Sequence, residues 1–167
     1  MSELRTTDES GPTEVRVSAV VDAPVERIFE LLADPARHGE LDGSGMVRAA
    51  EGTGPLTGVG QRFVMEMLWT DGVREYRVEN HVTRYEPGRA LEWLVADHGH
   101  DPQGWRWGWV LEPRPDGSTA VANYCDWSAV TDPEVLRAKG FPVVPAEQVA
   151  ATVRRLDEAV RPVPGPS

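Results

Sequence analysis

Three tryptophans that alternate along one segment, Trp105, Trp107 and Trp109, carry the clearest chemical signal in this chain. Alternate side chains of a β-strand point to the same face of a sheet, so the three indole rings are expected to share one face. Flat aromatic surfaces of this kind stack on other rings. The segment therefore predicts either a thick aromatic core or the wall of a cavity that holds a flat, apolar ligand.

Three turn sequences indicate which other residues share that face. Asp-Gly at residues 71–72 and Pro-Asp-Gly at residues 115–117 are typical of tight hairpins, and Pro-Gly at residues 87–88 marks another turn. The predicted cross-strand pairs are Phe63 with Asn80, Met65 with Val78, Met67 with Tyr76, Trp93 with Val82, Leu91 with Arg84, Val95 with Asn80, Leu111 with Val121, Trp109 with Asn123, Trp107 with Cys125 and Trp105 with Trp127. A slip of one residue would turn a strand over, so the agreement of the three registers supports this assignment.

The face defined by these pairs supplies the candidate ligand-binding residues. They are Phe63, Met65, Met67, Trp69, Tyr76, Asn80, Trp93, Trp105, Trp107, Trp109, Asn123 and Trp127. The opposite face carries mostly charged side chains and is expected to face water. The aromatic face then leaves two interpretations open, a filled core or a ligand cavity, and the second suits an apolar wall with a few polar groups.

The polar groups of this face have two roles open to them. A buried amide that lacks a hydrogen bond costs about 1–3 kcal/mol. Asn80 and Asn123 therefore either satisfy strand backbone or a buried water, or they orient a carbonyl or hydroxyl group of a ligand. Tyr76 could likewise orient a carbonyl or hydroxyl group of a ligand.

The predicted face contains no His, Asp or Glu, which counts against general acid–base catalysis by the sheet. A catalytic group would have to come from the loops, where His38, Asp42 and Ser44 are the candidates at a cavity mouth. We expect these three to lie in a solvated loop. Arg84 falls on the inward side near a strand end, where it either binds an anionic ligand group or, as we expect, forms a surface ion pair.

Three further motifs do not predict a site. The Asp-His-Gly-His-Asp segment at residues 97–101 has ligands for a divalent metal but no scaffold for a closed site, so we expect a polar hairpin loop. Cys125 lies between apolar neighbours without a flanking base, which indicates a core residue. The glycine-rich residues 52–58 lack the lysine of a phosphate-binding loop. The sequence thus predicts neither a metal nor a cofactor.

Composition narrows the classes of partner. The chain has 167 residues, suited to one domain, and a formal net charge of −10, which disfavours binding to nucleic acid or anionic membranes. It shows no bilayer-spanning stretch and no signal peptide. A single cysteine excludes an internal disulfide and fits a reducing compartment. We expect a cytoplasmic monomer or homodimer whose partner is a small hydrophobic molecule.

The order of predicted elements indicates the architecture. A strand at residues 14–21 precedes two short helices, a meander of long strands follows, and residues 145–160 form a helix with one apolar stripe. This order predicts an α+β fold in which a curved antiparallel sheet wraps around the long C-terminal helix. Residues 14–160 form the expected domain, and residues 1–13 and 161–167 are expected to be disordered tails.

Several segments carry a resemblance to a known family: Val-Val-Asp-Ala-Pro-Val-Glu-Arg-Ile-Phe at residues 20–29, Leu-Ala-Asp-Pro at 32–35, Tyr-Glu-Pro-Gly-Arg at 85–89 and Leu-Glu-Pro at 111–113. The chain resembles the START-like (SRPBCC) superfamily, in particular its polyketide cyclase/dehydrase and lipid-transport branch. The resemblance implies a helix-grip fold with a cavity between the sheet and the last helix. Leu41 stands where relatives often carry a tryptophan, so no aromatic gate is expected there.

The resemblance leaves three functions open, because one fold hosts many activities. The first is binding of a small apolar, aromatic or polyketide-like ligand in the cavity. The second is a cyclase, aromatase or dehydratase-type enzyme that uses the same cavity, chiefly by orienting its substrate. The third is a protein-interaction module, such as a chaperone activator, which would need an exposed apolar patch.

Overall fold

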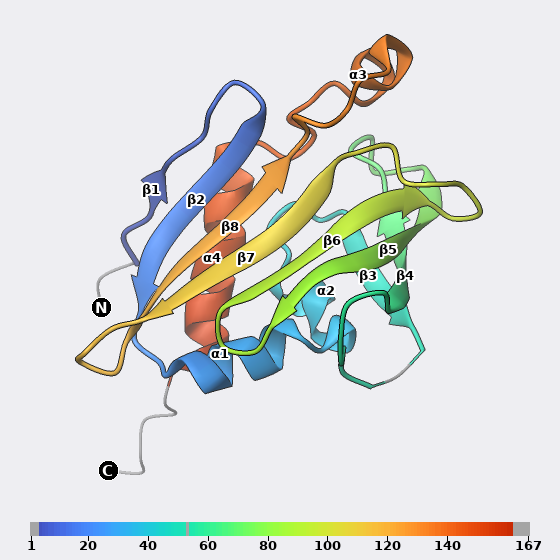
Figure 1. The fold of residues 1–167 in the computed structure, drawn as a ribbon. Coiled ribbons are helices and arrows are strands. Elements are labelled where there is room, and N and C mark those ends of the chain that lie inside the picture. The colour runs from blue at the N-terminus through green and yellow to red at the C-terminus, as the bar shows by residue number, and fades with distance from the viewer. Residues whose placement is uncertain (1–3, 53, 162–167) are drawn as a thin grey trace.

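The computed structural model describes residues 4–52 and 54–161 of the chain, and within them one antiparallel sheet covers one side of a long helix (Figure 1). The strands are β1 (Thr7–Asp8), β2 (Glu14–Val21), β3 (Val47–Glu51), β4 (Arg62–Leu68), β5 (Glu75–Glu86), β6 (Ala90–Asp97), β7 (Arg106–Pro113) and β8 (Thr119–Asp126). The helices are α1 (Val25–Leu32), the 3-10 helix η1 (Pro35–Arg37), α2 (His38–Leu41), α3 (Pro133–Lys139) and α4 (Ala146–Val160). The strand order is β1-β2-β8-β7-β6-β5-β4-β3. The predicted α+β helix-grip fold is confirmed.

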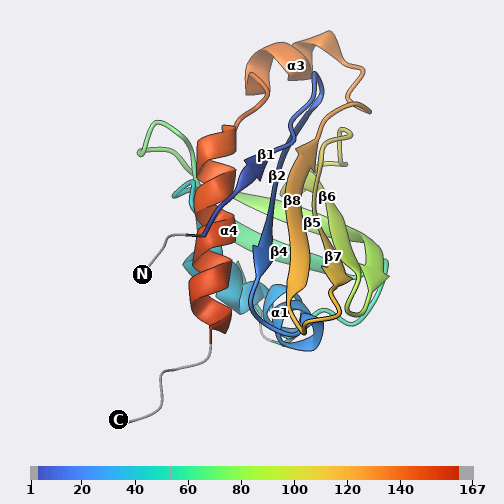
Figure 2. The ribbon, with the colours of Figure 1, turned by 90° about the vertical axis from the view of Figure 1, so that its left-hand side faces the viewer.

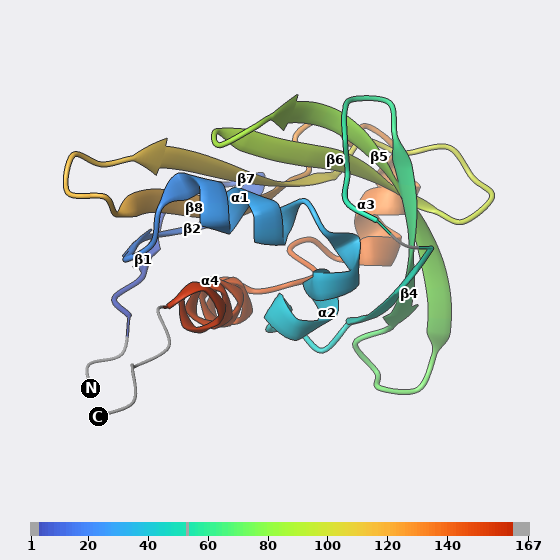
Figure 3. The same ribbon diagram turned by 90° about the horizontal axis from the view of Figure 1, so that it is seen from below.

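Helix α4 packs on the concave side of the sheet, as Figures 2 and 3 show from two directions. Its apolar residues recur at steps of four, three and four, which places them on one face of a helix. The buried members of this stripe are Val149, Val153, Leu156 and Val160. The sequence predicted this stripe and its burial, and both are confirmed.

Helix α1 closes one end of the fold. Ile28 and Leu32 are fully buried on its inner face. The guanidinium of Arg27 donates a hydrogen bond of 3.0 Å to the carbonyl oxygen of Val160, one of the last carbonyls of α4. The end of a helix leaves carbonyls without partners inside the helix, and a cation there also interacts favourably with the helix dipole. This contact connects α1 to the C-terminal end of α4.

The predicted registers hold for two of the three turns. Phe63 lies opposite Asn80, and Trp109 lies opposite Asn123. Trp93 lies opposite Val82 as predicted, but a bulge between Val82 and Arg84 shifts the rest of this hairpin. Leu91 therefore pairs with Tyr85, and the predicted pairing of Leu91 with Arg84 is wrong.

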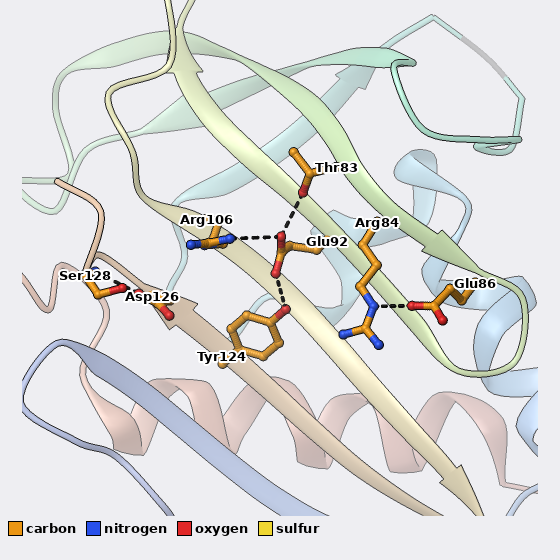
Figure 4. Close-up of polar contacts among 8 residues, drawn as sticks. All are labelled: Thr83, Arg84, Glu86, Glu92, Arg106, Tyr124, Asp126 and Ser128. Carbon is orange, nitrogen blue, oxygen red and sulfur yellow. Dashed lines mark hydrogen bonds and ion pairs between the residues drawn. The ribbon is translucent and has the colours of Figure 1, made fainter.

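The cause of the shift is the turn at residues 86–89. The backbone N–H of Arg89 donates to the carbonyl of Glu86, with Pro87 second and Gly88 third at a φ of 73°, as in a type II turn. Three residues thus form the loop instead of two, and the bulge restores the phase of the strand. Arg84 consequently lies on the outer surface, where it pairs with Glu86 (Figure 4). The expected surface ion pair is confirmed, and an inward Arg84 is ruled out.

The N-terminal segment is more ordered than the sequence predicts. Thr7 and Asp8 form β1, which pairs with Ser18 and Val17 of β2, inside the region expected to be a disordered tail. An edge strand exposes unpaired backbone groups, and β1 covers this edge of β2. At the other end, residues 162–167 of the expected C-terminal tail lie outside the described residues.

The convex face of the sheet carries a polar network that Figure 4 shows. The carboxylate of Glu92 accepts hydrogen bonds from the Tyr124 hydroxyl at 2.5 Å and from the Thr83 hydroxyl at 2.8 Å. Arg106 lies 3.5 Å from the same carboxylate. The Tyr124 ring lies over Gly108, its cross-strand partner, and only 6% of Tyr124 is exposed. A glycine is needed at that position because the ring occupies the space of a side chain.

No helix among the described residues combines the length and the apolar character needed to cross a membrane.

Gly108→Ala should lower the free energy of unfolding by about 1–3 kcal/mol, because overpacking forces neighbours to move. The added Cβ would overlap the hydroxyl and the ring carbons of Tyr124, so the ring must move and its hydrogen bond to Glu92 is disturbed. Urea unfolding of the single variant and of the same change in a Tyr124→Ala background measures the coupling. Equal losses in both backgrounds would contradict this account.

Candidate ligand-binding site

A cavity of about 160 Å³ lies between the concave face of the sheet, α2, α4 and the segment after α3. Of the twelve residues predicted to bind a ligand, all but Phe63 and Trp127 line it, which leaves ten. These ten are Met65, Met67, Trp69, Tyr76, Asn80, Trp93, Trp105, Trp107, Trp109 and Asn123. The structure therefore brings together, around one space, residues from strands β4 to β8.

Phe63 and Trp127 support the wall from behind. The Phe63 ring lies edge-on to Trp93, with ring centroids 5.4 Å apart. Trp127 stacks on Phe141 at 5.3 Å, and Phe141 itself lines the cavity. Both predicted residues are buried, but neither touches the space, because each is one layer further out.

His38 lies on the cavity wall, so the expectation of a solvated loop is wrong for this residue. The short turn η1 begins at Pro35, directly after Asp34, whose carboxylate caps it by accepting from the N–H of Ala36. This turn delivers His38 at the start of α2 to the space beneath the sheet. Its imidazole stacks on Trp93, with centroids 5.5 Å apart, and meets Phe63 edge-on at 5.7 Å.

The hydrogen bonds of His38 fix its chemical form. Nε2 lies 2.7 Å from the carbonyl oxygen of Leu32. A carbonyl oxygen can only accept, so Nε2 carries the hydrogen and Nδ1 keeps its lone pair in the neutral ring. Burial lowers the pKa of the imidazole below its usual range, and this outweighs the opposing effects of the Leu32 carbonyl and of Asp34. His38 is therefore a neutral base with a free acceptor nitrogen.

Asp42 and Ser44 also line the cavity, and they belong to a fixed loop. The Asp42 carboxylate accepts hydrogen bonds from the Ser44 hydroxyl at 2.7 Å and from the Val47 N–H at 3.0 Å. Between them, the Gly43 N–H donates to the Thr152 hydroxyl of α4 at 2.9 Å. A Cβ at Gly43 would lie 2.5 Å from the carbonyl oxygen of Gln148, so this approach to α4 requires glycine. The carboxylate thus holds the loop in place.

The two buried amides differ in what they bond. Asn123 donates from Nδ2 to the carbonyl of Gly108 at 3.0 Å. Asn80, 5% exposed, has an Oδ1 atom that is buried and finds no hydrogen-bond partner within the described residues. Strand backbone therefore accounts for Asn123, as one of the two open interpretations predicts. Asn80 is the polar group of the wall that the fold leaves unsatisfied.

Lys139, at the end of α3, lies at the edge of the cavity, and sequence analysis did not identify it. Its ammonium lies 5.0 Å from the ring centre of Trp105, 5.7 Å from that of Trp69 and 3.5 Å from the Asp97 carboxylate. Such cation–π contacts favour a fixed position. The one feature of the sequence that could have drawn attention to this residue is that Lys139 is the only lysine of the chain.

The remaining reactive groups of the wall stay protonated at neutral pH. Burial raises the pKa of the Cys125 thiol, with Asp126 and Glu14 adding to the effect, so the residue is a core thiol and not a nucleophile. Burial also raises the pKa of Tyr76, whose hydroxyl remains a hydrogen-bond donor. Among the described residues, no three His, Cys, Asp or Glu side chains are grouped so that they could hold a metal ion.

His38 gives the fold a characteristic pH dependence. The unfolded chain protonates this ring near its usual pKa of about 6.5, whereas the folded protein does so only at lower pH. Between these values the unfolded state binds more protons, so the free energy of unfolding should fall as pH falls below about 6.5. His38→Phe should reduce the slope by up to about 1.4 kcal/mol per pH unit. Urea unfolding from about pH 5 to pH 8 tests this, and equal slopes would contradict it.

A family model described as polyketide cyclase/dehydrase and lipid transport matches residues 12–161. The uncharacterized protein Rv0088 of Mycobacterium tuberculosis is 31% identical over 154 residues, which cover 90% of this chain and 65% of that protein. The chain thus spans about two-thirds of the length of this curated relative.

Solved structures share the fold at low sequence identity. Protein Ms6760 of Mycobacterium smegmatis has a TM-score of 0.65 at 17% identity, over 95% of this chain and 97% of that one. Norcoclaurine synthase of Thalictrum flavum, solved in complex with a transition-state analogue, has a TM-score of 0.60 at 14% identity, over 96% and 97% of the two chains. The fold is a hydrophobic ligand-binding fold. The match over residues 12–161 shows that this chain belongs to the polyketide cyclase/dehydrase and lipid transport family of SRPBCC-type proteins.

Proposed function

We propose that this protein binds a small apolar molecule, aromatic or polyketide-like, in the cavity beneath its sheet. One observation carries the proposal: five of the six tryptophans of the chain line a single cavity. They are Trp69, Trp93, Trp105, Trp107 and Trp109. Apolar walls with a few placed polar groups are typical of small-molecule sites, and indole faces suit stacking on flat rings.

The volume sets the size of ligand that fits without rearrangement. An apolar cavity of about 150 Å³ holds one benzene molecule, so about 160 Å³ accommodates a single ring with a small substituent. A larger ligand requires the wall to move. The segment that can move most easily is α3, which buries none of its residues and meets the cavity edge through Lys139. Figure 1 shows this helix standing away from the body of the fold.

An enzyme of the cyclase or dehydratase type is the second candidate, and His38 is the observation that favours it. General acid–base catalysis needs a titratable group within reach of the substrate, and a neutral imidazole on the cavity wall supplies one. The fold supports catalysis elsewhere, because the norcoclaurine synthase structure contains a transition-state analogue. Binding remains the broader proposal, since both candidates require it.

An interaction module has less support from the described surface. The large apolar residues exposed on it are Val20, Val59, Val73 and Leu136, which belong to four separate segments of the chain. Tyr124 on the convex face is buried, and its hydroxyl is bonded to Glu92, so it does not add an exposed apolar group. A docking surface would need a contiguous patch.

Trp107→Ala tests the proposal, with Trp127→Ala as a matched control. Trp107 is half-buried on the cavity wall, so its loss should weaken binding of aromatic probes by roughly tenfold or more, consistent with stacking. Its effect on stability should be smaller than the about 3–5 kcal/mol of a packed aromatic residue. Trp127 lies behind the wall, stacked on Phe141, so Trp127→Ala should cost the full amount of stability and weaken probe binding less than Trp107→Ala does.

The measurement is native mass spectrometry of gently purified protein, followed by calorimetric titration with one- and two-ring aromatic compounds and fatty acids. A bound, extractable small molecule or saturable binding is the expected result. A clean mass for the free protein, together with no binding across the panel, would show that the proposal is wrong and that the residues form a filled core.

The two amides should respond oppositely to replacement by leucine. Asn80→Leu removes an unpartnered buried amide beside an open space, so it should raise the free energy of unfolding by about 1–3 kcal/mol. Asn123→Leu leaves the Gly108 carbonyl without its side-chain donor and should lower that free energy by a similar amount. Urea unfolding of both variants provides the comparison. A loss of stability in Asn80→Leu would indicate a structural role for this amide.

A further inference from the structure

The segment between β8 and α4 contains a long stretch without a buried residue. This stretch, residues 131–143, is called the lid below, and it includes α3, which stands away from the body of the fold (Figures 1 and 2). Every residue of the lid is exposed or half-buried, whereas Val130 and Val144 at its two ends are buried. A segment with few buried contacts opens at a low cost in free energy. The two buried valines mark the points about which it can turn.

The lid reaches the cavity through three half-buried side chains, Lys139, Phe141 and Val143. The Phe141 ring stacks on Trp127, with ring centroids 5.3 Å apart, and lies 5.7 Å from the ring centre of Trp105. These side chains complete the cavity wall without being enclosed in the core themselves. The wall is therefore continuous on the side of the sheet and depends on a loosely held segment on the side of the lid.

Lys139 joins the lid to three separate parts of the cavity rim. Its ammonium lies near the rings of Trp69, after β4, and Trp105, before β7, and it pairs with Asp97 at the end of β6. These three partners line the cavity, and 21% of the lysine side chain is exposed. Cation–π contacts and ion pairs at such partly exposed positions are individually weak. They hold the lid closed and still break reversibly.

We propose that the lid is the entrance of the cavity and that Lys139 is the clasp that closes it. The proposal rests on the proposed binding function and adds how a ligand reaches the site. When the ammonium leaves the two indole rings and Asp97, Phe141 and Val143 move away with the lid and one wall of the cavity opens. The same movement admits ligands larger than the single ring that fits about 160 Å³.

Cys125 provides a reporter of this opening that needs no ligand. It is the only cysteine of the chain, it lines the cavity and it is 5% exposed. Burial raises the pKa of its thiol, so the closed protein reacts slowly with thiol reagents. The rate at which methyl methanethiosulfonate modifies Cys125, measured by mass spectrometry, therefore follows the population of the open state.

Lys139→Met removes the charge and keeps an unbranched side chain, so it should raise the modification rate of Cys125 by roughly fivefold to tenfold. Asp97→Asn should act in the same direction by a smaller factor, because both indole contacts remain. Arg137→Met is the matched control, since Arg137 is an exposed cation of α3 that pairs with Glu134. The rates should not depend on low concentrations of urea, which separates opening of the lid from global unfolding.

Stopped-flow tryptophan fluorescence with nitrobenzene then tests whether the lid is the entrance. Lys139→Met should raise the association and dissociation rate constants by the same factor, because the clasp closes the free and the loaded protein alike. Unchanged reactivity of Cys125 would show that Lys139 does not hold the lid. Faster modification with unchanged nitrobenzene kinetics, or a change in only one rate constant, would show that ligands enter elsewhere or contact Lys139 directly. If the unaltered protein binds no aromatic compound, the binding function fails and the entrance fails with it.

Discussion

The packing of α4 against one end of the curved sheet is the constraint on which the rest of this structure depends. The valine-rich stripe of the helix makes its main sheet contacts with β2 and β8. The aromatic residues of β4 to β7 therefore face a space that α4 borders only through Thr152. Two short elements, α2 and the segment after α3, close that space. Short elements leave room between large rings. The cavity follows from where the helix lies.

Much of this arrangement could be predicted from the sequence, because strand periodicity and turn chemistry are local. The Asp71-Gly72 and Pro115-Asp116-Gly117 turns sufficed to pair Phe63 with Asn80 and Trp109 with Asn123. The type II turn at residues 86–89 also has a local signature. Its consequence, a bulge after Val82, depends on how the strand keeps its apolar face buried, and no turn motif indicates that.

Two residues that the sequence placed wrongly or not at all come from outside the sheet: His38 was expected in a solvated loop, and Lys139 was not identified. Periodicity states which side of a strand a residue faces, but it cannot state which loop folds over that side. His38 and Lys139 reach the cavity because η1 and α3 deliver them across a chain separation of a hundred residues, a result of tertiary packing alone. The same limit explains Phe63 and Trp127. The sequence predicted the correct face of the sheet for both residues, but it could not show that they lie behind the side chains that line the cavity.

The polar groups of the cavity are better explained by function than by stability. A folded protein gains nothing from an amide oxygen without a partner at Asn80. It also gains nothing from a half-buried imidazole at His38 whose lowered pKa lets acid destabilise the fold. Leucine and phenylalanine would serve a filled core better at both positions. Stability and activity commonly conflict in this way at binding sites, where groups prepared for a ligand stay unsatisfied without it.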